Sequence, residues 1–271
     1  RPLTEEEIND FIENLGLKGK FATLIICLLN SKTGELYMCN AGDNLVHIYK
    51  SQSKSLQTLT LKSAPTAGVF SSELVRMRGG FSVEKTQLNR GDVLFLYTDG
   101  IEESTRRLRD SQYNIIMQDV EVHKINPQTH QEEIELKAEA AKEEFGFERI
   151  KNIIESVFER KKFFLQKEQN PDALEVLEFD FSKGDASLQQ AVLALAATEK
   201  VFRLYKNESV SENAYVRVDK KIDEFLNKYF NMYENYAAKK SDTENQNYVD
   251  YDMILEDEQS DDLTLLAIKL L

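Results

Sequence analysis

Six short apolar segments within residues 21–97 constrain the fold of this chain more than any other feature of its sequence. Their hydrophobic residues either alternate with polar residues or run without interruption, which are the patterns of half-buried and fully buried β-strands. Turns of four to six residues separate neighbouring segments, except for a longer connection at residues 62–80, and short turns favour antiparallel pairing. The predicted strands are residues 21–29, 35–39, 45–49, 56–61, 81–88 and 93–97.

Helical patterns lie before and after this strand-rich region. The predicted helices are residues 4–16, 148–158, 185–205 and 222–233. Asp185 is the expected N-cap of the third helix, and a last apolar strand is predicted at residues 263–268. Strands followed by helices and closed by one more strand indicate an α+β fold. We expect residues 1–271 to form a single domain.

The charge of the chain excludes one class of partner. There are 34 Lys and Arg against 47 Asp and Glu, a net charge of −13, which repels the phosphates of nucleic acids. Two cysteines cannot build a disulfide framework and favour a reducing compartment, and no apolar run approaches the roughly 20 residues of a membrane span. We therefore expect a cytoplasmic protein. Because the chain begins at Arg1, we expect it to be part of a longer parent, whose upstream region could carry a membrane anchor.

Acidic residues stand at the ends of predicted strands in three places. The candidates are Asp43, Asp99, Asp261 and Asp262, with Gly100 directly after Asp99. Each pattern alone is typical of a turn. Residues 241–262, however, hold nine acidic and no basic residues and lead into the last strand. Carboxylates from several strand ends can surround a hard cation such as Mg²⁺ or Mn²⁺, which prefers oxygen ligands.

Several motifs follow one another in the order found in a known family. They are Phe-Ala-Thr at 21–23, Asn-Ala-Gly at 40–42, the loop at 65–68, Gly-Asp at 91–92 leading to Leu-Tyr-Thr-Asp-Gly at 96–100, Phe-Gly at 145–146 with Arg-Ile at 149–150, and Asp-Asp-Leu-Thr-Leu-Leu at 261–266. The ordered set resembles the metal-dependent protein phosphatases of the type 2C class, in the bacterial branch that includes the stage II sporulation phosphatase and the sigma-factor regulators. The resemblance covers roughly residues 20–101, 145–160 and 217–271.

This resemblance implies an αββα four-layer sandwich in which two Mg²⁺ or Mn²⁺ ions activate a water that attacks phosphorus directly. It implies that Asp99 and Asp261 bind metal through their carboxylates, and Gly100 through its backbone carbonyl. Asp262 stands where the wider class often has Asn. Asp43 stands where the bacterial branch has His, and matches an Asp that serves an additional metal in the wider class. The implied partners are a phosphorylated protein substrate of the anti-sigma-factor-antagonist type and an upstream sensor domain.

The sequence departs from the family pattern at its beginning and in two insertions. The family's Asp-Gly-His-Gly motif, which carries a metal-bridging Asp, does not occur in this chain. We therefore expect the C-terminal portion of a catalytic domain, lacking its N-terminal strands, that binds divalent metal weakly and is inactive or nearly so alone. Residues 102–144 and 161–216 are insertions relative to the usual core, and we expect them to be helical.

Two other functions stay open on the sequence alone. A pseudophosphatase would act as a binding or scaffold module through its helical insertions. A structural fragment would pair with another copy as a homodimer, because missing strands expose sheet edges. An Asp-Gly-His-Gly motif upstream of Arg1 would favour the enzyme over the scaffold.

Overall fold

The computed structural model describes residues 21–42, 45–70, 72–77, 79–110, 114–125, 132–166, 176–206, 218–219, 239–240, 248–250, 254–259 and 261–271. The helices predicted at residues 4–16 and 222–233 lie outside these residues, as does Asp43. The chain divides into two compact units, one formed by residues up to 96 with residues 267–271, the other by residues 97–266. That residues 1–271 form one domain stays a prediction.

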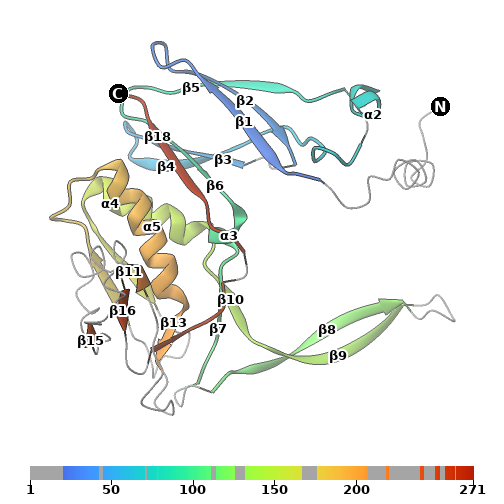
Figure 1. Ribbon diagram of the computed structural model, residues 1–271, viewed down its shortest axis with the longest axis vertical. Helices are drawn as coiled ribbons and strands as arrows, with labels where there is room; N and C mark the ends of the chain where they lie inside the picture. Colours follow the sequence, from blue (N-terminus) through green and yellow to red (C-terminus); the bar gives the residue numbers. More distant parts are fainter. Residues whose placement is uncertain are drawn as a thin grey trace. The chain divides into compact units, whose positions relative to one another are not determined.

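The first unit contains two β-sheets, whose strands β6 and β18 run on into the second unit (Figure 1). The three-stranded sheet has the order β1 (Leu24–Leu29), β2 (Glu35–Ala41) and β5 (Val83–Gln87). The four-stranded sheet has the order β18 (Leu265–Lys269), β6 (Val93–Tyr97), β3 (Leu45–Lys50) and β4 (Ser55–Thr60). The six strands predicted in residues 21–97 and the last strand are confirmed. A short helix, α2 (Ser72–Met77), precedes β5.

Side chains from both sheets share one hydrophobic core. Leu36 and Met38 of β2 belong to the same cluster as Val46 and Ile48 of β3 and Leu94 of β6, and all five are almost completely buried. Burying an aliphatic side chain of this size contributes roughly 1.5–3 kcal/mol. The alternation in the sequence thus gives two sheet layers with apolar faces in common, and the fold class is α+β, as predicted.

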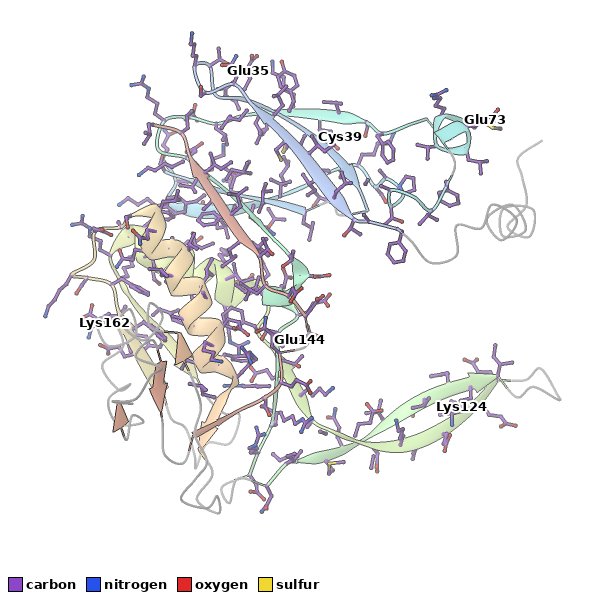
Figure 2. All side chains as sticks on the ribbon, in the orientation of Figure 1. Glu35, Cys39, Glu73, Lys124, Glu144 and Lys162 are labelled. Carbon is purple, nitrogen blue, oxygen red and sulfur yellow. The ribbon has the colours of Figure 1, made fainter. Side chains whose placement is uncertain are left out.

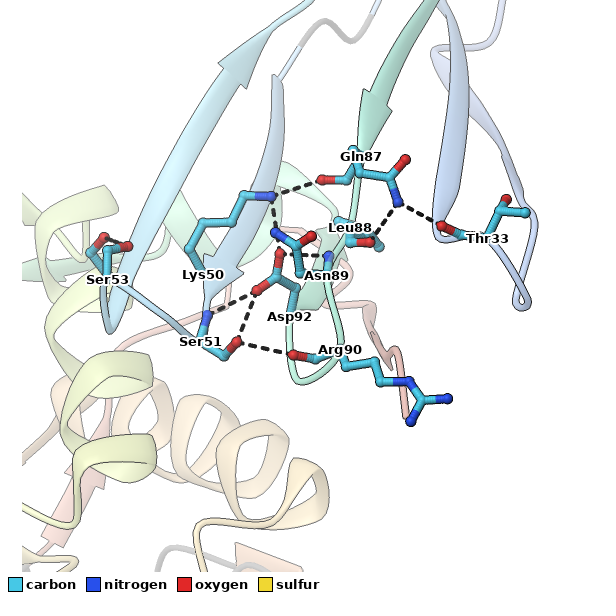
Figure 3. Close-up of polar contacts among 10 residues, drawn as sticks. Thr33, Lys50, Ser51, Ser53, Gln87, Leu88, Asn89, Arg90 and Asp92 are labelled. Carbon is cyan, nitrogen blue, oxygen red and sulfur yellow. Dashed lines mark hydrogen bonds and ion pairs between the residues drawn. The ribbon is translucent and has the colours of Figure 1, made fainter.

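A buried carboxylate fixes the turn before β6. The side chain of Asp92, 1% exposed, accepts hydrogen bonds from the backbone N–H groups of Asn89 (3.0 Å) and Ser51 (2.9 Å), the Ser51 hydroxyl (3.1 Å) and the Lys50 ammonium (3.0 Å; Figure 3). Burial raises the pKa of the Asp92 carboxyl, but these hydrogen bonds and the Lys50 charge outweigh it and hold the pKa below its ordinary value. The turn thereby ties β3 to the strand that leads to Asp99.

The second unit contains two main helices, α4 (Phe147–Glu159) and α5 (Leu188–Arg203). The helix predicted at residues 148–158 is confirmed as α4. The predicted cap of the next helix is wrong by two residues, because the Ser187 hydroxyl accepts the hydrogen bond from the backbone N–H of Gln190 (3.1 Å). Asp185 instead accepts from the backbone N–H of Ser187 (2.9 Å) and so shapes the turn before the helix. None of the described helices is long and apolar enough to cross a membrane.

The second unit also contains several small β-sheets. They are β7 (Thr105–Arg107) with β10 (Lys142–Glu144), β11 (Lys162–Gln166) with β12 (Val176–Asp180), β13 (Leu204–Lys206) with β17 (Ile254–Glu256), and β14 (Val218–Asp219), β16 (Tyr248–Asp250) and β15 (Lys239–Lys240) as a small sheet. A single-turn helix, α3 (Asp99–Glu102), follows β6.

The described residues of the first predicted insertion, residues 102–144, form mainly strands, which corrects the prediction that both insertions are helical. Strands β8 (Met117–Ile125) and β9 (Glu132–Ala140) form a long antiparallel ribbon with mostly exposed side chains, such as that of Lys124 (Figure 2). Val120 and Val122 recur with a period of two rather than 3.6, which is the spacing of a strand. The second predicted insertion, residues 161–216, contains α5 and is helical in part.

Candidate metal-binding site

Asp99 follows the end of strand β6 by two residues. The strand residues Leu94 and Phe95 are 1% exposed and hold the strand in the core, whereas Thr98 and Asp99 are exposed. The backbone of Thr98 is extended, and α3 begins at the next residue. The buried strand therefore fixes where the main chain of Asp99 lies, while its carboxylate faces solvent.

Thr98 joins the two acidic motifs. Its hydroxyl donates a hydrogen bond to the carbonyl oxygen of Asp262 (2.9 Å) and accepts one from the backbone N–H of Thr264 (3.0 Å). The backbone N–H of Thr98 also donates to the carbonyl oxygen of Thr264 (3.1 Å). Residues 98–100 and 261–264, far apart in sequence, thus lie side by side at the start of β18.

Gly100 lies against the main chain of the second motif. A Cβ atom at this position would be 2.5 Å from the carbonyl oxygen of Asp262 and 3.4 Å from the carbonyl carbon of Asp261. Only a residue without a side chain allows this approach. The glycine of the Asp-Gly motif is therefore required by the contact between the motifs, in addition to any role of its carbonyl oxygen.

The Asp261–Asp262 segment has a defined local conformation. The Asp261 carboxylate accepts a hydrogen bond from the backbone N–H of Asp262 (2.7 Å), and the Asp261 carbonyl oxygen accepts one from the side-chain amide of Gln259 (2.8 Å). Both aspartates are exposed, as is Asp99. Ionised oxygen ligands in a solvated position suit Mg²⁺ or Mn²⁺, which keep part of their water shell.

The described residues do not by themselves complete a metal centre. Within them, no group of three or more His, Cys, Asp or Glu side chains is placed to hold a metal ion. The structure brings Gly100 and the main chain of Asp262 together, but Asp43 lies outside the described residues. The described residues therefore supply at most part of a metal site. The predicted ligands are Asp43, Asp99, Gly100, Asp261 and Asp262, and their roles stay predictions.

A third motif of the predicted family, Phe145–Gly146, is hydrogen-bonded to the end of α3 and to the residues just after it. The backbone N–H of Gly146 donates to the carbonyl oxygen of Glu102 (2.9 Å), and that of Phe145 donates to the carbonyl oxygen of Ser104 (2.7 Å). Phe145 is completely buried, and Gly146, with φ of +74°, precedes α4. Burial raises the pKa of the Glu102 carboxyl, with further contributions from Glu103 and Glu144, which lies on β10 (Figure 2).

The sequence did not predict a buried ionic cluster that is connected to Asp261 through Gln259. It consists of Ser104, Arg109, Glu199, Arg203 and Asp257, each at most 7% exposed. One signal could have pointed to it. Glu199 and Arg203 stand four residues apart in α5 among buried apolar residues, where charged side chains must be paired.

Comparison with known proteins assigns the chain to a family. The family model of stage II sporulation protein E (SpoIIE) matches residues 5–146, just over half of the chain, including Asp99, Gly100 and Phe145. The chain therefore belongs to the stage II sporulation protein E family. No curated protein matches the chain.

Parts of two solved structures are similar to part of this chain. One contains the RsbU and RsbW domains of a Mycobacterium tuberculosis protein, with 25% identity, 40% of this chain and 27% of that chain covered, and a TM-score of 0.27. Another contains the PP2C phosphatase domain and a fragment of the regulatory domain of the cell fate determinant SpoIIE from Bacillus subtilis. It has 17% sequence identity, covers 36% of this chain and 28% of that chain, and has a TM-score of 0.25. The match spans less than a third of each of these chains. The family assignment rests on the sequence match.

Proposed function

We propose that this chain is part of a metal-dependent protein phosphatase that removes phosphate from phosphoserine or phosphothreonine in a regulatory protein. One observation carries the proposal: Thr98 hydrogen-bonds the Asp262 carbonyl oxygen and the Thr264 N–H, so the Asp-Gly and Asp-Asp motifs meet. The match to the stage II sporulation protein E family supports the same reaction class. Bound Mg²⁺ or Mn²⁺ would supply an activated water and neutralise charge on the phosphoryl oxygens.

In this proposal, Asp99 and Asp261 provide carboxylate ligands and Gly100 a carbonyl ligand. Their main chains are fixed by β6, by α3 and by the contact with Asp262, so little order would have to be gained on binding. Asp262 follows Asp261 directly in the sequence, is also exposed, and is a further ligand candidate. Asp43 is retained as a candidate on the sequence motif alone.

We further propose that residues 1–271 alone bind divalent metal weakly and have little activity. The chain has no Asp-Gly-His-Gly motif, and its described residues hold no group of three metal-binding side chains. Fewer charged ligands give weaker binding of a hard cation. The substrate class is an anti-sigma-factor antagonist protein, and an upstream sensor domain would control the reaction in the cytoplasm.

A second candidate function is a pseudophosphatase that acts as a binding or scaffold module. It is favoured by the same incomplete donor set in the described residues, and by the ordered strands and helix of the two insertions. Pairing of two copies through exposed sheet edges is the third candidate. Light scattering would distinguish a dimer from a monomer.

The activity assay measures phosphate release from a phosphoserine protein at increasing Mn²⁺. Residues 1–271 are expected to release little phosphate. Where the natural protein extends upstream of Arg1, the extended protein is expected to show Mn²⁺-dependent release that is abolished in Asp99→Asn and in Asp261→Asn. Asp119→Asn, on the exposed face of β8, is the matched control and should retain the wild-type rate. Equal rates in the extended protein and in all three of its variants would refute the proposed phosphatase site.

A further inference from the structure

The buried ionic cluster begins with an ion pair inside α5. The Arg203 guanidinium and the Glu199 carboxylate are 2.5 Å apart (Nε to Oε1), and the two residues are 2% and 3% exposed. The Ser104 hydroxyl donates to the same Glu199 oxygen (2.7 Å). Burying a charge costs free energy unless the charge is paired and fully hydrogen-bonded. The side chains of Glu199 and Arg203 are therefore expected to keep these hydrogen bonds and this conformation.

Asp257 is held by both insertions. Its carboxylate accepts two hydrogen bonds from the Arg109 guanidinium (2.7 and 3.0 Å) and one from the backbone N–H of Arg107 (2.9 Å). Its backbone N–H donates to the carbonyl oxygen of Arg203 (3.0 Å), and its own carbonyl oxygen accepts from the Arg203 guanidinium (2.9 Å). Arg107 and Arg109 lie in the first insertion and Arg203 in the second.

The same guanidinium reaches towards the acidic segment through Gln259. An Nη atom of Arg203 donates to the side-chain oxygen of Gln259 (3.4 Å). The side-chain nitrogen of Gln259 donates to the carbonyl oxygen of Asp261 (2.8 Å). A continuous series of hydrogen bonds therefore runs from the interior of α5 to the residue that precedes Asp262.

We propose that Arg203, Asp257 and Gln259 are positioning residues for the Asp261–Asp262 segment, so that the two insertions hold the carboxylates of the candidate metal site in place. This inference deepens the proposed function and rests on it. Two adjacent carboxylates repel each other, and the hydrogen bond from the Asp262 N–H to the Asp261 carboxylate is local and does not tie the segment to other elements. The segment is held from one side by Thr98 and from the other by Gln259, whose side chain accepts a hydrogen bond from Arg203 in the second predicted insertion.

The test uses amide hydrogen exchange of the full chain, measured by NMR in the presence of a chelator. The informative amides are those of Asp262 and Thr264, which donate to the Asp261 carboxylate and the Thr98 hydroxyl. Gln259→Glu keeps an acceptor for Arg203 but loses the donor to Asp261. Arg203→Lys keeps the charge but loses the branched geometry that reaches Asp257 and Gln259 together. Glu258→Gln, an exposed neighbour, is the matched control.

Both variants are expected to raise exchange at Asp262 and Thr264 about tenfold, the effect of losing roughly one hydrogen bond, with no change in Glu258→Gln. Because Gln259 is exposed, Gln259→Glu should leave the thermal unfolding midpoint unchanged, so that the effect is local. Wild-type exchange at both amides in Gln259→Glu would overturn the inference. The readout needs neither metal nor activity, so a failure here is distinguishable from a failure of the phosphatase proposal.

Discussion

Gly100 and Asp262 approach so closely that a Cβ atom on Gly100 would lie 2.5 Å from the Asp262 carbonyl oxygen. Since Gly100 has no positive φ, this contact alone excludes a side chain there. Gly100→Ala is therefore expected to lower the free energy of unfolding by about 1–3 kcal/mol, the cost of forcing atoms into a packed site, and to increase exchange of the Asp262 amide. Chemical denaturation and amide exchange provide the measurements.

Gly79→Ala is the contrasting variant for this prediction. A Cβ atom there meets nothing within 4 Å, but φ is +101°. Backbone strain should cost about 1–2 kcal/mol without any change at Asp262. If Gly100→Ala were as stable as the wild-type protein, with unchanged exchange at Asp262, the two motifs would not lie in contact as described.

The Asp92 carboxylate is expected to be a main source of stability in the first unit. Asp92→Asn removes the charge that faces Lys50 and one acceptor oxygen, which should cost about 1.5–3 kcal/mol in urea denaturation at neutral pH. Because the folded-state pKa is lowered, this contribution is present above the ordinary pKa and is lost on acidification below it. The exposed Ser53→Ala should change stability by less than about 0.5 kcal/mol. An equal effect of both substitutions would contradict this account.

His47 is expected to make stability depend on pH between about 4 and 6.5. The side chain is 4% exposed, its Nδ1 atom lies 3.1 Å from the Thr58 hydroxyl, and burial lowers its pKa to about 4. The unfolded chain therefore binds more protons in this range, so His47 contributes stability that is complete above pH 6.5 and is lost as pH falls towards 4. The contribution is at most about 3 kcal/mol.

Thermal unfolding of wild type and His47→Gln from pH 4.5 to pH 7.5 checks this prediction. The variant should be less stable at pH 7.5, and the difference should shrink as the pH falls. His123→Gln, on the exposed ribbon, is the control and should follow the wild-type curve. A difference between wild type and His47→Gln that is constant across the range would mean that His47 does not titrate as described.

The strands of the first unit were predictable because their side chains face a common core. Leu36 and Met38 alternate with partly exposed residues in β2, and the continuous apolar run of β6 marks a strand buried on both faces. The ribbon of β8 and β9 was missed, because side chains on both of its faces are mostly exposed and charges hide the alternation of Val120 and Val122.

The two acidic motifs were predictable because each is a local pattern next to an apolar strand. Their contact in the structure is made by the hydrogen bonds of Thr98 and by the close approach of Gly100 to the main chain of Asp262. Their surroundings were not predictable. Arg109 and Asp257 are 148 residues apart, and Gln259 is 56 residues from Arg203. No local periodicity connects such pairs. Only the low exposure expected of one face of α5 could have indicated that Glu199 and Arg203 need partners.

The most direct test of the account is Mn²⁺ binding by residues 1–271, followed by electron paramagnetic resonance of the free ion. We expect weak binding that is lost in Asp99→Asn and in Asp261→Asn and retained in Asp119→Asn, because two carboxylates from the adjoining motifs would supply the ligands. Binding that is the same in the wild-type chain and in all three variants would contradict the claim that Asp99 and Asp261 form part of a metal site.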